Sequence, residues 1–457
     1  MPRNKSDFLR PLPHFSFRYC YWLLFLAAVG CTSYGEIKNT EIENIESKRG
    51  YSLREWRQNH DRGEITLILT FSGGGTRAAA MAYGVLEELR DTNYLSNGVS
   101  KRLLDEVDDI SSVSGGSFTA AFYGLHGEEI FDTFENEFLR LDMDKPLTES
   151  LVDPLHWFTH KGRTERTIEY YEKALFHGAT YADMMKPGRP MIIINTSDLA
   201  YGVRFSFIQE YFNFLCSDLT DFKVARAVTA SSAVPILFNP VVIKNYASCG
   251  DYDSIWPEDA AEYAPQDAEF RMLYEGLKSY ADKSHRKYIH FVDGGITDNM
   301  GLRAAYDMIL LSGGPNSYFK NMRAESPSHV VVISVNASTH PMTEMDESNK
   351  EPSIIGAVNA MSGVQLHRYN TDTIEVMQSK LSGWAKLLST PGHEVHAHFI
   401  QVTFQDVNEP QLKLSLNKIP TSFHLTNEQV DSLIETSRSL LRESAGFKAL
   451  LNELNEQ

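Results

Sequence analysis

Residues 66–77 have the sequence TLILTFSGGGTR, a run of strand-forming residues that ends in three successive glycines. Residues 78–90 follow with apolar side chains at helical spacing and four alanines, so the pattern predicts a strand, a glycine turn and a helix. The amides of Gly73, Gly74 and Gly75 can line a concave nest for an anion. Arg77 is then either a second positive group for that anion or an anchor that fixes the loop.

A second turn of this kind follows about forty residues later, where residues 112–116 have the sequence SVSGG. Residues 107–113 predict a short strand and residues 117–124 the start of a helix, so Ser114 lies on the bend. A serine on such a bend exposes its hydroxyl at the end of the sheet and needs small neighbours, here Gly115 and Gly116. The free amides of the following helix favour negative charge. Ser114 is therefore the candidate nucleophile, although Ser112 stands where this elbow motif usually has glycine.

A third motif supplies a carboxylate. Residues 287–292 predict a strand that runs directly into Asp293, Gly294 and Gly295, and an aspartate at that strand end can face the serine. The alternative is a triad of serine, histidine and aspartate, for which the chain offers fifteen histidines. His290 is the nearest in sequence, but residues three apart on a strand point to opposite faces.

Residues 73–78 also fit the pattern Gly-x-Gly-x-x-Ala of dinucleotide-binding folds, which makes nucleotide binding an alternative. That fold needs an acidic residue at the end of a clean second strand, whereas the acidic residues here precede the Ser114 turn. No Lys-Ser or Lys-Thr pair follows the glycines, so a Walker-type loop is also disfavoured.

The three motifs resemble, in order and spacing, those of the patatin-like phospholipase family: Gly-Gly-Gly-x-Arg, Gly-x-Ser-x-Gly and Asp-Gly-Gly. Residues 194–199, 225–235 and 298–302 are similar to the same family, and the resemblance spans residues 66–337. It implies a three-layer α/β/α fold with a mostly parallel central sheet. It also implies that Ser114 is the nucleophile, Asp293 the general base, and Gly73, Gly74 and Gly75 the oxyanion hole, with Arg77 supporting and Gly115 and Gly116 forming the elbow.

The resemblance implies an enzyme that cleaves ester bonds of phospholipids or other lipids through an acyl-enzyme, with no metal and no organic cofactor. Two alternatives remain open from the sequence. Because Ser112 replaces the usual glycine of the elbow motif, one alternative is a catalytically idle lipoprotein that binds lipid in the same cleft. An acyltransferase would use the same acyl-enzyme with an alcohol in place of water.

The pattern divides the chain into residues 1–30, 31–60, 61–340 and 341–457. The third segment is the predicted patatin-like catalytic domain, and residues 330–335 are a continuous apolar strand of the kind buried in parallel sheets. The last segment is a predicted C-terminal, mainly helical extension packed on the core. It contains a helix over 354–388, a strand over 396–404 and a helix over 427–454, for which Thr426 and Gln429 form a capping box.

The N-terminal segment predicts a signal peptide, since four basic residues precede a twelve-residue apolar run that is too short to span a membrane. Residues 26–31, LAAVGC, resemble a bacterial lipobox, with Cys31 as the acylated first residue of the mature chain. An ordinary signal peptidase would suit the same bond. Thr32 in place of aspartate favours the outer membrane, so the predicted location is the bacterial cell envelope, with residues 31–60 as a polar tether.

The net charge is −17, and −20 once residues 1–30 are removed, which makes nucleic acid a poor partner. The same charge disfavours global attraction to anionic membranes, so a lipid substrate would be reached through the acyl anchor or a local apolar rim. Cys216 and Cys249 form either one disulfide in an oxidising compartment or two buried thiols. The sequence carries no signal of the oligomeric state.

Overall fold

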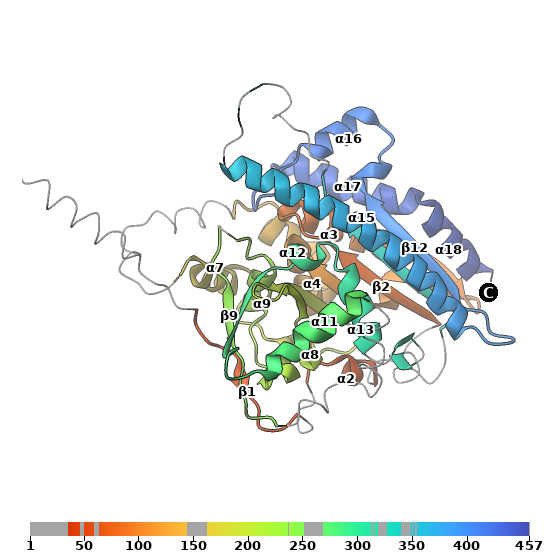
Figure 1. The fold of residues 1–457 in the computed structure, drawn as a ribbon. Helices are drawn as coiled ribbons and strands as arrows, with labels where there is room; N and C mark the ends of the chain where they lie inside the picture. The colour runs from red at the N-terminus through yellow and green to blue at the C-terminus, as the bar shows by residue number, and fades with distance from the viewer. Residues whose placement is uncertain are drawn as a thin grey trace, which may run out of the picture.

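We describe the protein from a computed structural model (Figure 1). It describes residues 35–45, 50–58, 64–143, 162–235, 237–250, 268–311, 314–315, 317–318, 327–339, 349, 351 and 354–456. The predicted signal peptide and Cys31 lie outside these residues. Within the described part of the chain, no helix is both long enough and apolar enough to cross a membrane.

An eight-stranded sheet forms the centre of the molecule. Its order is β12-β11-β2-β5-β6-β10-β9, with β7 paired to β6. The strands are β2 (Ile65–Phe71), β5 (Val107–Val113), β6 (Met191–Asp198), β7 (Val203–Ser206), β9 (Val241–Lys244), β10 (Tyr288–Asp293), β11 (His329–Asn336) and β12 (His396–Thr403). The first five strands in the order are parallel to their neighbours, while β7, β9 and β10 pair antiparallel. The predicted mostly parallel sheet is confirmed, with an antiparallel region at one side.

Helices cover both faces of this sheet, which gives the predicted three layers (Figure 1). One face carries α3 (Thr76–Asp91), α4 (Gly115–His126), α9 (Val224–Ser231), α17 (Asn427–Glu443) and α18 (Ala445–Asn455). The other carries α12 (Gly295–Asp298), α13 (Leu302–Leu311) and the long α15 (Ile354–Leu388), drawn in cyan across the front. Because both faces are covered, β2, β6 and β11 are buried along their whole length.

The remaining elements lie around this core. They are β1 (Thr40–Glu41), α2 (Leu53–Gln58), β3 (Asn93–Ser96), β4 (Val99–Arg102), α5 (Ile130–Phe134), α7 (Arg163–Tyr171), α8 (Gln209–Phe214), β8 (Ser217–Asp218), α11 (Ala268–Lys278) and α16 (Pro410–Asn417). β1 and β8 form a separate two-stranded antiparallel sheet, as do β3 and β4.

The C-terminal segment contributes to the core. β12 pairs in parallel with β11 as an edge strand of the main sheet, and α17 packs along α3. The predicted capping box of Thr426 and Gln429 is confirmed at the start of α17. The single helix predicted over 427–454 is wrong in one respect, because the chain breaks at Ser444. The Ser444 hydroxyl accepts a hydrogen bond from the amide of Phe447 and so starts α18 as a separate helix.

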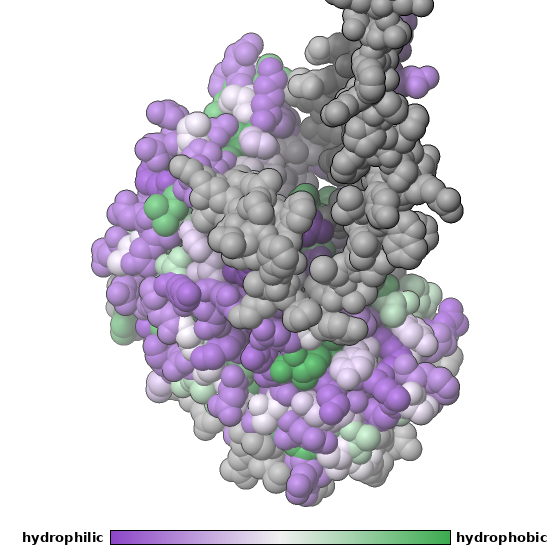
Figure 2. Space-filling model, turned by 90° about the vertical axis from the view of Figure 1, so that its left-hand side faces the viewer, coloured by the Kyte–Doolittle hydropathy of each residue, from purple (hydrophilic) through white to green (hydrophobic). Residues whose placement is uncertain are grey.

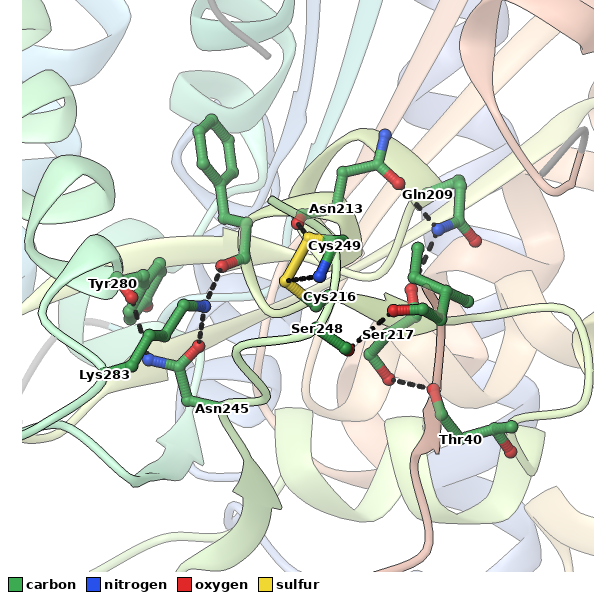
Figure 3. Close-up of a disulfide and its surroundings, with 12 residues drawn as sticks. Thr40, Gln209, Asn213, Cys216, Ser217, Asn245, Ser248, Cys249, Tyr280 and Lys283 are labelled. Carbon is green, nitrogen blue, oxygen red and sulfur yellow. Dashed lines mark hydrogen bonds between the residues drawn. A yellow bond between two sulfur atoms is a disulfide. The ribbon is translucent and has the colours of Figure 1, made fainter. Parts of the chain in front are cut away.

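A disulfide joins Cys216 to Cys249 and settles the alternative left open by the sequence (Figure 3). It lies between the end of α8 and the turn after β9. The segments that it joins are also held by hydrogen bonds, since Ser217 Oγ donates to the carbonyl of Thr40 at 2.9 Å and Ser248 Oγ to that of Ile42 at 2.7 Å. The crosslink therefore secures the end of the molecule where β1 pairs with β8.

Replacing both cysteines with serine should lower the free energy of unfolding by about 3 to 4 kcal/mol, because the closed loop is 33 residues long and its closure limits the unfolded chain. Denaturant unfolding of the double variant measures the loss. Wild-type protein reduced before unfolding is the control and should show a similar decrease. Detection of two free thiols in denatured, unreduced protein would contradict the disulfide.

Candidate active site

Ser114 follows the last residue of β5 and caps the N-terminus of α4. Its φ of 49° and ψ of −119° lie outside the regions that residues with a side chain normally adopt. This turn is the predicted elbow. It is held in place by a hydrogen bond of 2.8 Å from the Ser114 amide to Ser231 Oγ.

The Ser114 hydroxyl donates a hydrogen bond of 3.0 Å to Asp293 Oδ2. The sheet explains this meeting, because β6 lies between β5 and β10: Asn195 pairs with Val113 on one side, and Thr196 pairs with Asp293 on the other. The predicted meeting of hydroxyl and carboxylate is therefore present. Only 7% of the Ser114 surface and 8% of the Asp293 surface are exposed.

Burial raises the pKa of Asp293 to about 6, although hydrogen bonds from the Gly295 amide and from Ser114 oppose the increase. The Gly295 amide donates to Asp293 Oδ1 at 2.7 Å, so this oxygen is fixed and Oδ2 faces the serine. A carboxylate with this pKa is a stronger base than an exposed aspartate and is still ionised at pH 7.

Among the described residues, no histidine hydrogen-bonds to Ser114 or Asp293. His290, the nearest in sequence, is exposed on β10. Ser114 and Asp293 are therefore the hydroxyl and carboxylate that the geometry brings together.

The predicted oxyanion loop needs one correction. The amide of Gly73 donates to the carbonyl of Asn299 at 2.9 Å, so it is not available to a substrate. The amides of Gly74 and Gly75 have no hydrogen-bond partner among the described residues, and both glycines have positive φ, 143° and 63°. Two amides of the loop, rather than three, are the candidate oxyanion donors.

Two helix N-termini meet beside Ser114. α3 begins at Thr76, directly after the glycine loop, and α4 begins at Gly115. A side chain on Gly115 would overlap the backbone of Gly75, so the two helix ends are in contact. Both ends place the positive side of a helix dipole toward the site, where it favours a developing oxyanion.

Arg77 acts as the anchor, one of the two roles predicted for it. Its buried guanidinium donates to the carbonyl of Ala337 at 2.9 Å, to that of Ile419 at 2.6 Å and to Thr421 Oγ1 at 3.0 Å. It therefore ties the start of α3 to the end of β11 and to the loop that precedes α17.

Ser112 and Gly116 complete the elbow. Ser112 Oγ donates to the carbonyl of Ile193 at 3.3 Å within the sheet, and the Gly116 amide donates to the carbonyl of Ser72 at 3.2 Å. The side chain of Ser112, which replaces the usual glycine, is thus accommodated by a hydrogen bond between β5 and β6.

Ser231, the last residue of α9, was missed as a site residue by the sequence reasoning. Its hydroxyl accepts the Ser114 amide and donates to the carbonyl of Asn195 at 2.6 Å. Its carbonyl accepts the amide of Gly294 at 3.1 Å, and the carbonyl of Ala233 accepts that of Asp293 at 3.0 Å. One short segment therefore holds both halves of the pair. The only signal in the sequence was the family-like segment 225–235, which did not reveal this role.

Ser231→Ala should reduce kcat about tenfold to a hundredfold with a smaller change in KM, because the Ser114 amide and the Asn195 carbonyl lose their partner and the nucleophile shifts. Steady-state ester hydrolysis measures the effect. Ser232→Ala is the matched control, since its hydroxyl bonds only within its own helix, to Val228. Equal rates for both variants would show that Ser231 does not position the nucleophile.

A cavity of about 250 Å³ opens between the end of β11 and α15. Its lining includes Asn336, Ser338, Arg368 and Asn370. Asn299 links this cavity to the glycine loop by hydrogen bonds. Its side-chain amide donates to Ser338 Oγ at 3.4 Å, and its backbone carbonyl accepts from the amide of Gly73.

Comparison with known proteins identifies a family. A family model described as "Patatin-like phospholipase" matches residues 69–306, just over half of the chain. The match includes Ser114, Asp293 and the glycine loop. No curated protein matches the chain.

Solved structures of human GIVD cytosolic phospholipase A2 resemble the chain weakly. One has a TM-score of 0.37 at 13% identity and another, in complex with methyl gamma-linolenyl fluorophosphonate, 0.35 at 12%. The alignments cover 92% and 88% of this chain but only 66% and 61% of those chains. VipD from Legionella pneumophila gives 0.29 at 12% identity, covering 86% of this chain and 67% of that one. This chain thus spans less than two thirds of the length of the human enzyme.

Proposed function

Because this chain belongs to the patatin-like phospholipase family, we propose that it is a serine acyl hydrolase that cleaves ester bonds of phospholipids or related lipids. The observation that carries the proposal is the 3.0 Å hydrogen bond from Ser114 Oγ to Asp293 Oδ2, formed beside two helix N-termini. The proposal uses no metal or organic cofactor in the ester cleavage.

In the first half-reaction, Ser114 Oγ attacks the ester carbonyl carbon while Asp293 Oδ2 takes the hydroxyl proton. The carbonyl oxygen becomes an oxyanion, which the amides of Gly74 and Gly75 stabilise. The bond between the carbonyl carbon and the leaving oxygen then breaks, and Asp293 returns the proton to the departing alcohol. The acyl group remains on Ser114.

In the second half-reaction, Asp293 takes a proton from a water molecule that attacks the acyl carbonyl. The same two amides stabilise the second oxyanion. The bond to Ser114 Oγ breaks, the serine regains its proton from Asp293, and the fatty acid leaves. One carboxylate serves both steps because its pKa lets it accept and release a proton near neutral pH.

Exposed apolar side chains next to the site support a lipid substrate. Ile296 follows the Asp293 motif and is 53% exposed, while Val234 and Leu237 follow the Ser231 segment and are 39% and 59% exposed. The face shown in Figure 2 is mostly hydrophilic, with apolar residues in small separate patches. We therefore place the lipid contact at a local apolar rim formed by Val234, Leu237 and Ile296.

A fluorophosphonate probe together with a panel of phospholipids and simpler lipid esters tests the proposed activity. Covalent labelling at Ser114 and release of fatty acid are expected, both in detergent or mixed micelles. Absence of labelling and of fatty acid release would instead favour the lipid-binding alternative. Transfer of the acyl group to an added alcohol in preference to water would identify an acyltransferase.

We also propose that the mature chain is anchored in a bacterial envelope through lipidated Cys31. The support comes from the lipobox-like sequence of residues 26–31 and from the disulfide between Cys216 and Cys249, since disulfides persist in oxidising compartments. Incorporation of labelled palmitate in wild type, and its loss in Cys31→Ala, would support the anchor. Equal incorporation in both would remove it.

A further inference from the structure

Three histidines and one glutamate lie together at the end of the sheet where the parallel strands begin, opposite the end where Ser114 lies. His329 is the first residue of β11, and His396 and His398 stand near the start of β12, whereas Ser114 follows the end of the parallel strand β5. His329 pairs with His396 across the two parallel strands. Since alternate residues of a strand share a face, all three imidazoles lie on one face of the sheet. Their rings are stacked, with centroids 5.3 Å and 5.8 Å from that of His329.

Glu453 of α18 completes the group from above this face. Its Oε2 atom lies 3.1 Å from His398 Nε2, 3.5 Å from His329 Nε2 and 3.4 Å from His396 Nδ1. Tetrahedral zinc with ligand bonds of 2.0–2.1 Å places neighbouring ligand atoms about 3.3 Å apart. The donor atoms of His329, His398 and Glu453 all lie within 4.8 Å of one another.

The environment of His329 points to a ligand. Its side chain is fully buried, and its Nε2 atom makes no hydrogen bond of normal geometry with any described residue. On the other side of the ring, Nδ1 lies 2.9 Å from Ser328 Oγ. The Ser328 hydroxyl donates to the carbonyl of Glu64 at 3.1 Å, so it accepts the proton of Nδ1.

In a neutral ring this tautomer leaves a lone pair on His329 Nε2. That lone pair faces a carboxylate oxygen, and two further imidazoles lie alongside, an arrangement that is repulsive unless a cation lies between them. A metal-binding histidine normally has this arrangement: the second ring nitrogen donates to a fixed acceptor, and the first is directed at the metal.

We propose that His329, His398 and Glu453 bind a divalent transition-metal ion of the zinc type, with a water molecule as the fourth ligand. Imidazole nitrogens favour zinc, copper, nickel or iron over calcium and magnesium, which prefer oxygen ligands. The ion would join α18 to the first residues of β11 and β12. Its role is structural, and it is separate from the ester cleavage proposed above.

The alternative is a hydrogen-bonded group in which a protonated histidine pairs with Glu453 and no metal binds. The two differ in measurable ways. A metal site binds one ion per chain with defined coordination, and its affinity depends on each ligand. A hydrogen-bonded group gains no stability from added zinc.

The experiment uses the full chain, stripped with a chelator and then titrated with zinc chloride by calorimetry and by metal analysis after dialysis. One zinc per chain and an increase in melting temperature are expected. Glu453→Gln and His398→Gln should each weaken zinc binding at least tenfold. His285→Gln is the control, because this exposed histidine contacts only Asp282 and Ser284 among the described residues and should leave zinc affinity unchanged.

Glu453 is partly exposed on a helix, so its glutamine variant keeps the shape of the site and should fold. Cobalt substitution of the wild-type protein provides a second readout, a visible spectrum typical of four-coordinate nitrogen and oxygen ligation. The proposal is overturned if wild type takes up no zinc, or if both Glu453→Gln and His398→Gln bind zinc as wild type does. None of these readouts uses esterase activity, so they are independent of the proposed function.

Discussion

Ser114→Ala should reduce ester hydrolysis by at least about a thousandfold, because the variant loses the atom to which the acyl group is transferred. The residual rate would reflect substrate binding and the oxyanion donors alone. The fold should be retained, since the hydroxyl of Ser114 contacts Asp293 but its backbone hydrogen bond to Ser231 remains. Fatty acid release from the best lipid in the panel is the measurement, with fluorophosphonate labelling beside it.

Ser112→Ala is the matched control for this loss. Ser112 lies two residues earlier and is also buried, but its hydroxyl bonds to Ile193 inside the sheet. It should keep most of the activity and all of the labelling. Near-normal turnover in purified Ser114→Ala would contradict the assignment of the nucleophile.

Asp293→Asn should have an effect of similar size, about a thousandfold or more, because asparagine cannot accept the serine proton. In wild type, kcat/KM should fall about tenfold per pH unit below a pH of about 6, where Asp293 becomes protonated, and level off above it. The Asn variant should show no such inflection. The control is Asp282→Asn, because the exposed carboxylate of Asp282 hydrogen-bonds only to Ser284 and His285 among the described residues. This variant should keep the wild-type rate and the wild-type pH profile. A wild-type profile without a decrease in acid would argue against Asp293 as the base.

Although Asp293→Asn should lower activity, it should increase the free energy of unfolding above a pH of about 6. The pKa of Asp293 is raised on folding from 3.8 to about 6. Between these two pH values the folded state still holds a proton that the unfolded state has released. The favourable contribution is complete below pH 4 and is lost as pH increases through about 6. Above that pH the buried charge costs roughly 3 kcal/mol, which Asp293→Asn removes. Denaturant unfolding of both proteins should show only a small difference at pH 4 and the full difference at pH 8.

Much of the fold could be predicted because its signals are local. β5, β11 and α15 were predicted within about one residue of their observed ends. The apolar run of β11 and the length of α15 are signals within a short window, and the end of β5 is marked by the glycine turn that follows it. The break at Ser444 was missed because Ser444 and its neighbours continue a helical pattern, and only the packing of two helices on the sheet shows where it stops.

The sequence predicted those parts of the site that short motifs mark. The pair of Ser114 and Asp293 follows from two glycine-marked strand ends. The loss of the Gly73 amide to Asn299, the anchor made by Arg77 and the bridging hydroxyl of Ser231 depend on contacts between segments far apart in the chain. The grouping of His329 with His398 similarly depends on strand register, which the sequence did not specify.

The contact between Gly75 and Gly115 limits which substitutions the glycine loop and the Ser114 turn can accept. A methyl group at Gly115 would overlap the backbone of Gly75, and a methyl group at Gly75 would overlap the backbone of Ser422. Either substitution would therefore displace the glycine loop relative to Ser114. If the proposed lipid hydrolysis holds, substitutions that change the choice of lipid are expected outside this contact, such as in the loop after α9.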